Sequence, residues 1–230
     1  MPRSIICALD TSNLDEAIAT TKRLSPWVNT FKIGHALTLP NGLNVIEKLQ
    51  DAGAERIFLD LKFHDIPNSV ALAVREAAKH RVWMMTVHLT GGPAMLTAAV
   101  EEARAYGEGQ RPLIVGVSVL TSLDEQTLQN HLGVNRSLEE HMIFLSKEGM
   151  NADLDGVVCS AHEVKVLREA LGKQAVIVTP GIRLGGATHD QKRVGDPNKA
   201  LEDGADYLVI GRALSSADNP EELIQSLNLD

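Results

Sequence analysis

Charged residues of alternating sign follow an apolar run near residue 60. The segment 58–68 reads FLDLKFHDIPN. Because side chains on a strand alternate between its two faces, Asp60 and Lys62 are expected to lie on the same face. Opposite charges on the inner face of a buried strand are costly to desolvate, and a strand with a purely structural role would carry Val or Ile there. If D-x-K stood by itself, a structural ion pair at the end of a strand would be enough to explain it.

The residues after Lys62 extend this pattern to D-x-K-x-x-D-I-P-N. Asp65 adds a second carboxylate just past the expected strand end, and Pro67 helps to fix the turn that follows. No structural requirement demands all of these residue types at this spacing. The pattern therefore indicates a cluster of catalytic charges rather than a structural ion pair.

Short apolar runs alternate with amphipathic stretches along the chain, and the runs are continuous, as in strands covered on both faces. We predict strands at Ser4–Leu9, Thr30–Ile33, Arg56–Leu61, Trp83–His88, Leu113–Val119, Gly156–Cys159, Ala175–Val178 and Tyr207–Ile210. We predict helices at Leu14–Leu24, Asn41–Ala52, Val70–His80, Gly92–Ala105, Leu138–Glu148, Ala161–Ala170, Asn198–Asp203 and Pro220–Leu227, with 130–140 a polar surface excursion.

These repeating units predict an α/β protein made of a single (β/α)8 TIM barrel, with residues 1–230 forming one catalytic domain. A chain of 230 residues has a common size for such a barrel. A doubly wound open sheet is the alternative. No G-x-G-x-x-G follows the first strand, which favours the barrel.

The composition excludes several classes of protein. The net charge of −8 argues against a broad surface for nucleic acid or membranes, so an anionic ligand requires a local basic cluster. The two cysteines, Cys7 and Cys159, lie in apolar runs and are expected to be reduced core residues of a cytoplasmic protein. We expect no signal peptide and no membrane span. The eight histidines show no paired-ligand spacing, so we expect no metal site.

The active site of such a barrel is built where its strands end. Almost every predicted strand ends in a polar or charged group. In chain order these groups are Asp10, Lys32, Asp60 with Lys62, His88, residues 118–122 with Thr121, residues 179–183 with Arg183, and Gly211 with Arg212. A barrel without a catalytic role has no reason for this arrangement.

The segments after the seventh and eighth strands resemble a phosphate site, which barrels often place between these two loops. Gly181 and Gly211 allow backbone N–H groups to approach an anion closely. Arg183 and Arg212 can donate forked hydrogen bonds, and Arg212 is the better placed. If Gly-Arg stood by itself, the start of a helix with an exposed arginine would be enough to explain it. The combination with T-P-G-I-R at a strand end favours phosphate binding.

Together these residues resemble the orotidine 5′-phosphate decarboxylase family over most of the chain. The D-x-K-x-H-D-I-P-N element is the most specific part of the resemblance. Ser69 departs from many members, which have Thr at that position. The other matching segments are 8–10 (ALD), 31–34 (FKIG), 87–88 (VH), 91–92 (GG), 120–122 (LTS), 179–183 (TPGIR), 190–194 (DQKRV) and 211–212 (GR).

The resemblance implies decarboxylation of orotidine 5′-monophosphate to uridine 5′-monophosphate, the last step of pyrimidine synthesis, without metal or organic cofactor. It implies a charge array of Lys32, Asp60, Lys62 and Asp65, with Asp65 acting in the partner's site of a homodimer. Loss of CO2 leaves a carbanion at the pyrimidine C6, and we expect Lys62 to stabilise and protonate it. Asp60 would crowd the departing carboxylate.

Substrate-binding residues follow from the same resemblance. Lys32 and Asp10 would reach the ribose hydroxyls, and Thr121 would contact the pyrimidine edge. Residues 184–192 would form a lid that phosphate binding closes. Arg183, Gln191, Gly211 and Arg212 would hold the phosphate, and Ile66 and Ser69 complete the set of expected substrate contacts.

Two other functions compete with this interpretation. A metal-dependent decarboxylase or aldolase of a sister barrel family would have similar motifs but tends to carry an acidic metal ligand on the second strand, where this chain has Lys32. A catalytically silent phosphate-binding barrel would show a degenerate charge array, and this array is intact. The residues favour the nucleotide enzyme.

Overall fold

A closed parallel barrel forms the centre of the computed structural model, which describes residues 4–107, 109–182 and 195–227. Each strand pairs with the next, and β1 pairs with β8 through Ile6 and Val209, so the sheet has no free edge. The strands of the described chain are β1 (Ile5–Ala8), β2 (Thr30–Ile33), β3 (Arg56–Phe63), β4 (Met84–His88), β5 (Leu113–Val117), β6 (Gly156–Val158), β7 (Val176–Thr179) and β8 (Tyr207–Ile210). The predicted (β/α)8 TIM barrel is confirmed.

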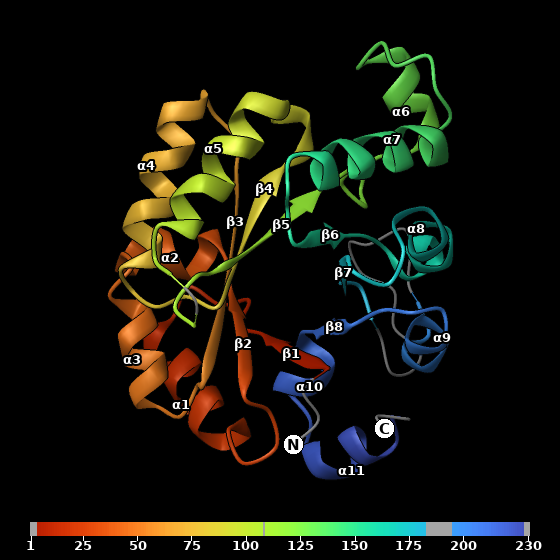
Figure 1. Ribbon diagram of the computed structural model, residues 1–230. Coiled ribbons are helices and arrows are strands. Elements are labelled where there is room, and N and C mark those ends of the chain that lie inside the picture. The colour runs from red at the N-terminus through yellow and green to blue at the C-terminus, as the bar shows by residue number, and fades with distance from the viewer. Residues whose placement is uncertain (1–3, 108, 183–194, 228–230) are drawn as a thin grey trace.

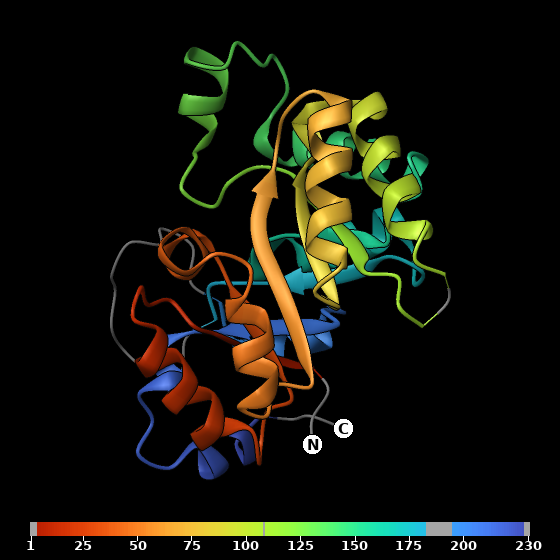
Figure 2. The ribbon, with the colours of Figure 1, turned by 90° about the vertical axis from the view of Figure 1, so that its left-hand side faces the viewer.

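Helices surround the barrel (Figures 1 and 2). They are α1 (Leu14–Leu24), α2 (His35–Asn41), α3 (Val45–Asp51), α4 (Pro67–Ala78), α5 (Pro93–Arg104), α6 (Glu125–Asn130), α7 (Leu138–Asn151), α8 (Val164–Leu171), α9 (Pro197–Glu202), α10 (Arg212–Ser215) and α11 (Pro220–Gln225), with 3-10 turns at Leu89–Gly91 and Ala161–Glu163. None of the helices in the described ranges is long and apolar enough to cross a membrane.

The helix predictions were wrong at three places. The single helix expected at Asn41–Ala52 corresponds to α3 alone, because Gly42, whose φ is +66°, separates it from the helix α2, which was not predicted. The short helices α6 and α10 were not predicted. Helix α6 is started by Asp124, whose side chain accepts a hydrogen bond from the N–H of Thr127. Figure 1 shows α6 at the edge of the molecule, and the helix ends where the predicted excursion at 130–140 begins.

Two separate apolar layers hold this architecture. The larger layer lies between the strands and the helices and includes Cys7 and Cys159, which are both buried and unpaired. Burial raises the pKa of the Cys7 thiol to about 12. A smaller cluster fills the inside of the barrel and consists of Ile6, Ala8, Phe58, Met84, Val115, Val178 and Val209.

The inner cluster sets the position of the candidate site. Phe58 on β3 and Met84 on β4 belong to it. Because side chains alternate along a strand, Asp60 and Thr86 lie on the same inner face, one layer closer to the carboxyl ends of the strands. The apolar cluster is therefore the floor beneath the polar groups of the barrel mouth.

Candidate active site

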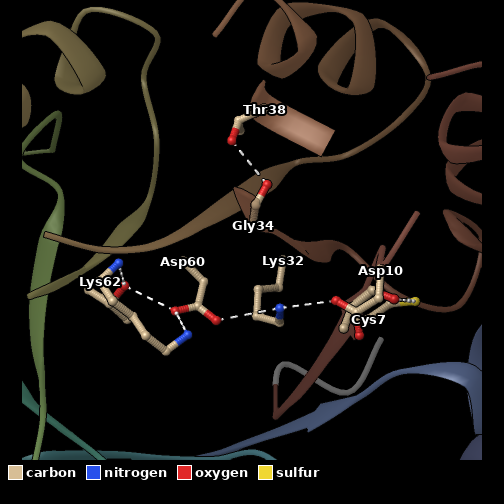
Figure 3. A network of polar contacts seen from close by, with 9 residues as sticks. Cys7, Asp10, Lys32, Gly34, Thr38, Asp60 and Lys62 are labelled. Carbon is tan, nitrogen blue, oxygen red and sulfur yellow. Dashed lines mark hydrogen bonds and ion pairs between the residues drawn. The ribbon is translucent and has the colours of Figure 1, made fainter. Parts of the chain in front are cut away.

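Four charged side chains, from β2, β3 and the segment just after β1, form a continuous row at the carboxyl end of the barrel (Figure 3). Lys62 Nζ lies 2.8 Å from Asp60 Oδ1, and Lys32 Nζ lies 3.4 Å from Asp60 Oδ2. On its other side, Lys32 Nζ lies 3.3 Å from Asp10 Oδ1. We call the residues Asp10, Lys32, Asp60 and Lys62 the charge row. The sequence predicted that these residues would share one rim, and the structure brings them together.

Asp60 lies at the centre of the charge row and is its most enclosed carboxylate. Its side chain is only 14% exposed, against 62% for Asp10. Burial alone would raise the pKa of Asp60, but the ammonium groups of Lys32 and Lys62, with hydrogen bonds to the carboxylate, hold this pKa below its usual range. The row therefore keeps a negative charge fixed between two cations in a partly desolvated site.

Lys62 reaches this row from an irregular backbone. Leu59 pairs with Met85 and Phe63 with Val87, so residues 60–62 of β3 face the single residue Thr86 of β4. This is the insertion of extra residues that defines a β-bulge. Lys62 has a φ of +51°, in the left-handed region, which costs a non-glycine residue about 1–2 kcal/mol. Such strain at a charged residue is typical of functional sites.

Thr86 holds this irregular segment with its hydroxyl group. The backbone N–H of Lys62 donates to Thr86 Oγ1 at 2.8 Å, and Thr86 Oγ1 donates to Asp60 Oδ1 at 3.0 Å. The side chain is completely buried. Sequence reasoning missed Thr86, because a threonine within an apolar run reads as an ordinary strand residue.

Two histidines border the charge row. The rings of His64 and His88 lie 5.2 Å apart between centroids. Burial, followed by the nearby His64 and Lys62, lowers the pKa of His88 below its usual value. This shift favours the neutral form of the His88 imidazole at the end of β4.

Among the described residues, Asp65 forms no ion pair with the charge row. It is exposed, and its Oδ1 accepts a hydrogen bond from the N–H of Ile66 at 2.6 Å. Ile66 precedes the first residue of α4 and is 67% exposed, and Ser69 lies in the first turn of that helix, partly buried. These three residues thus form an outward-facing corner beside the mouth of the barrel.

The other expected substrate contacts lie on later strands. Gly211 follows β8 next to Asp10, since a Cβ atom on Gly211 would lie 3.4 Å from Asp10 Oδ2. Arg212 is exposed at the start of α10, and Thr121 is partly exposed after β5. Arg183, Gln191 and the expected lid at residues 184–192 lie outside the described residues. In the described ranges, no three His, Cys, Asp or Glu side chains are grouped so that they could hold a metal ion.

Comparison with known proteins gives one consistent result. Residues 3–227 match the model of the orotidine 5′-phosphate decarboxylase / HUMPS family. The chain belongs to this family. It is 43% identical to orotidine 5′-phosphate decarboxylase from Vibrio vulnificus, covering 98% of this chain and 97% of that protein. It is 44% identical to the enzyme of the same name from Pseudoalteromonas translucida, covering 98% and 96%.

A solved structure supports the same relationship. The crystal structure of orotidine 5′-phosphate decarboxylase from Lactobacillus acidophilus has a TM-score of 0.84 to this chain at 33% identity, covering 97% of this chain and 96% of that one. The resemblance found in the sequence motifs therefore extends over the whole barrel, and membership of the orotidine 5′-phosphate decarboxylase / HUMPS family is confirmed.

Proposed function

We propose that this protein decarboxylates orotidine 5′-monophosphate to uridine 5′-monophosphate in pyrimidine biosynthesis, as a carboxy-lyase whose single catalytic domain spans residues 1–230. The observation that carries the proposal is the charge row, in which Asp60 is held between Lys32 and Lys62 at the mouth of the barrel. The names of the relatives and of the matched structure point to the same reaction.

The row suits the electrostatic demands of this reaction. Breaking the bond from C6 to the carboxylate releases CO2 and leaves the bonding electron pair on C6. An ammonium beside C6 stabilises this charge, and transfer of its proton to C6 completes the product. Lys62 is the proposed donor. Its Nζ is already directed by Asp60 at 2.8 Å, so little reorganisation is needed when the carbanion forms.

The remaining roles follow the order of the strands. Lys32 and the exposed Asp10 would bind the ribose hydroxyls, and Thr121 would contact the pyrimidine edge. Asp65 would act from the partner subunit, and Ile66 and Ser69 would contact the substrate. The proposed phosphate ligands are Arg183, Gln191, Gly211 and Arg212.

A mechanism without metal or cofactor is part of this proposal. Its support is chemical, because Lys62 can supply both the positive charge and the proton that a metal ion and a separate acid would otherwise provide. The second strand presents the cation Lys32 beside Asp60 rather than a further carboxylate. This arrangement favours the nucleotide enzyme over a metal-dependent sugar-phosphate decarboxylase or aldolase.

The first prediction tests the reaction and the absence of a metal together. Protein dialysed against EDTA should consume orotidine 5′-monophosphate as fast as untreated protein, measured by the loss of substrate absorbance. Protein that is inactive until Mg2+ or Zn2+ is added would contradict the metal-free mechanism and favour the sister enzymes. Activity on a sugar phosphate but not on the nucleotide would contradict the proposed substrate.

Arg212 provides the second prediction. Arg212→Ala should weaken substrate binding by about 2–4 kcal/mol, the scale for truncating one partner of a charge pair that binding buries. For a nucleoside substrate without the phosphate, the same substitution should cost much less binding free energy. Arg104→Ala is the matched control, because Arg104 ends α5 at the opposite end of the barrel and pairs with Asp153. Equal losses on both substrates would show that Arg212 does not bind the phosphate.

We also propose a cytoplasmic homodimer. Three exposed large apolar side chains, Leu39, Ile66 and Leu72, lie on or next to α2 and α4, the helices that follow the neighbouring strands β2 and β3. Large apolar side chains exposed on a surface favour contact with a partner. Asp65 adjoins Ile66 in this region, so an interface there would bring it to the neighbouring subunit.

A further inference from the structure

We propose that Thr86 is a positioning residue whose hydroxyl group fixes both the carboxylate of Asp60 and the backbone of Lys62 in their reactive geometry. The inference rests on the proposed function, because it concerns the same charge row. It adds a residue from β4 to a row that otherwise comes from β2, β3 and the segment after β1.

The first step of the argument is the hydrogen-bonding capacity of the hydroxyl. A threonine hydroxyl can donate one hydrogen bond and accept two. Thr86 Oγ1 accepts from the N–H of Lys62 at 2.8 Å and donates to Asp60 Oδ1 at 3.0 Å. One buried atom therefore links the main chain of the proposed proton donor to the side chain of its carboxylate neighbour.

The second step concerns the bulge. An extra segment in a strand leaves backbone groups without their usual ladder partners. The Lys62 N–H is such a group, and Thr86 Oγ1 takes the place of a backbone carbonyl. Because Lys62 has a left-handed φ of +51°, its conformation must be held by surrounding contacts. The bond from its own N–H is the contact that acts directly on that torsion.

The third step concerns Asp60 Oδ1. This oxygen accepts from both Lys62 Nζ and Thr86 Oγ1, while Oδ2 faces Lys32. The hydroxyl thus restrains rotation of the carboxylate, so that one oxygen is directed to each lysine. If the carboxylate rotated, Lys62 Nζ would lose the hydrogen bond that directs it. A misplacement of about 1 Å in a reacting group can lower the reaction rate greatly.

Three variants separate the hydroxyl from the volume of the side chain. Thr86→Val keeps the shape and removes both hydrogen bonds. Thr86→Ser keeps the hydroxyl and removes the methyl group. Thr30→Val is the matched control, because Thr30 is a completely buried threonine at the start of β2, remote from the carboxyl ends of the strands where the charge row lies.

Kinetics give the first readout. Thr86→Val should lower kcat by about 10- to 100-fold, the scale for loss of hydrogen bonds to charged groups, with little change in KM. Thr86→Ser should restore most of kcat, and Thr30→Val should keep it. The acid limb of the kcat profile should move to higher pH in Thr86→Val, since an Asp60 that loses a hydrogen bond to its ionised form is easier to protonate. The other charged or titratable groups near Asp60 are Lys32, Lys62, His88 and, through Lys32, Asp10.

Hydrogen exchange gives a second readout that needs no substrate. The amide of Lys62 should exchange faster in Thr86→Val than in the wild type and in Thr86→Ser, while the amides of α1 keep their rates. Wild-type kcat in Thr86→Val, equal losses in Thr86→Val and Thr86→Ser, or an unchanged Lys62 amide would each overturn the inference. If the wild type fails to decarboxylate the nucleotide, the proposed function fails, and the exchange result still decides whether Thr86 holds the segment.

Discussion

Lys62→Ala should lower kcat by at least about 10²- to 10⁴-fold, the range for loss of a positioned general acid. The substitution removes one of the two positive charges beside Asp60 and the proposed source of the proton. Binding of the product uridine 5′-monophosphate should change little, because the group acts mainly on the charge that develops during the reaction. Steady-state kinetics and calorimetric titration with the product measure these two effects separately.

Lys79→Ala is the matched control for this experiment. Lys79 follows α4 at the end of the barrel opposite the charge row and pairs with Glu76 on the surface. Its removal should leave kcat unchanged. Near-normal turnover of Lys62→Ala would remove Lys62 from the mechanism, and an equal loss of product binding would assign it to ground-state binding instead.

Asp65→Ala should also be inactive, and mixing it with Lys62→Ala should restore activity. In a mixed dimer, one site receives both defects, while the other combines the intact Lys62 of one chain with the intact Asp65 of its partner. With free exchange, a two-fold interface and independent sites, the recovered activity should approach about a quarter of the wild-type value. Activity measured after subunit exchange tests this expectation.

The charge row supplies a control for the mixing experiment. Asp60 and Lys62 contact each other within one chain, at 2.8 Å. A mixture of Asp60→Ala with Lys62→Ala should therefore stay inactive, because each site of the mixed dimer lacks one of the two groups. If the Asp65→Ala mixture also fails despite demonstrated exchange, then Asp65 does not act across the interface.

The sequence predicted the barrel better than it predicted the helices. Continuous apolar runs between polar segments mark buried parallel strands clearly, and each predicted strand overlaps an observed one. The short helix α2 was missed because Gly34 and Pro40 read as loop residues, yet Gly34 precedes the helix and Pro40 lies in its last turn. Such a helix is stabilised by packing of Leu37 in the core rather than by its own sequence.

The sequence predicted that Asp60 and Lys62 share a face, but it did not predict the backbone that brings them together. Regular alternation along β3 placed both side chains on one face. In the structure they meet across a bulge with a left-handed residue, and β3 extends to Phe63, two residues beyond its predicted end. A bulge depends on pairing with the neighbouring strand, so β3 alone carries no signal for it. The role of Thr86 could not be predicted from the sequence either, because it depends on the same pairing of β3 with β4.

Closure of the barrel has a consequence for how the protein acquires its activity. The whole charge row comes from residues 10–62, whereas Gly211 is about 150 residues further along the chain and reaches Asp10 only when β8 pairs with β1. During synthesis or refolding, the early strands can therefore assemble the row before the last strand arrives. A pairing between the first and last strands closes the longest loop in the fold, which is entropically the most demanding step. The rate at which activity returns during refolding would then report the pairing of β1 with β8. It would not report the formation of the charge row.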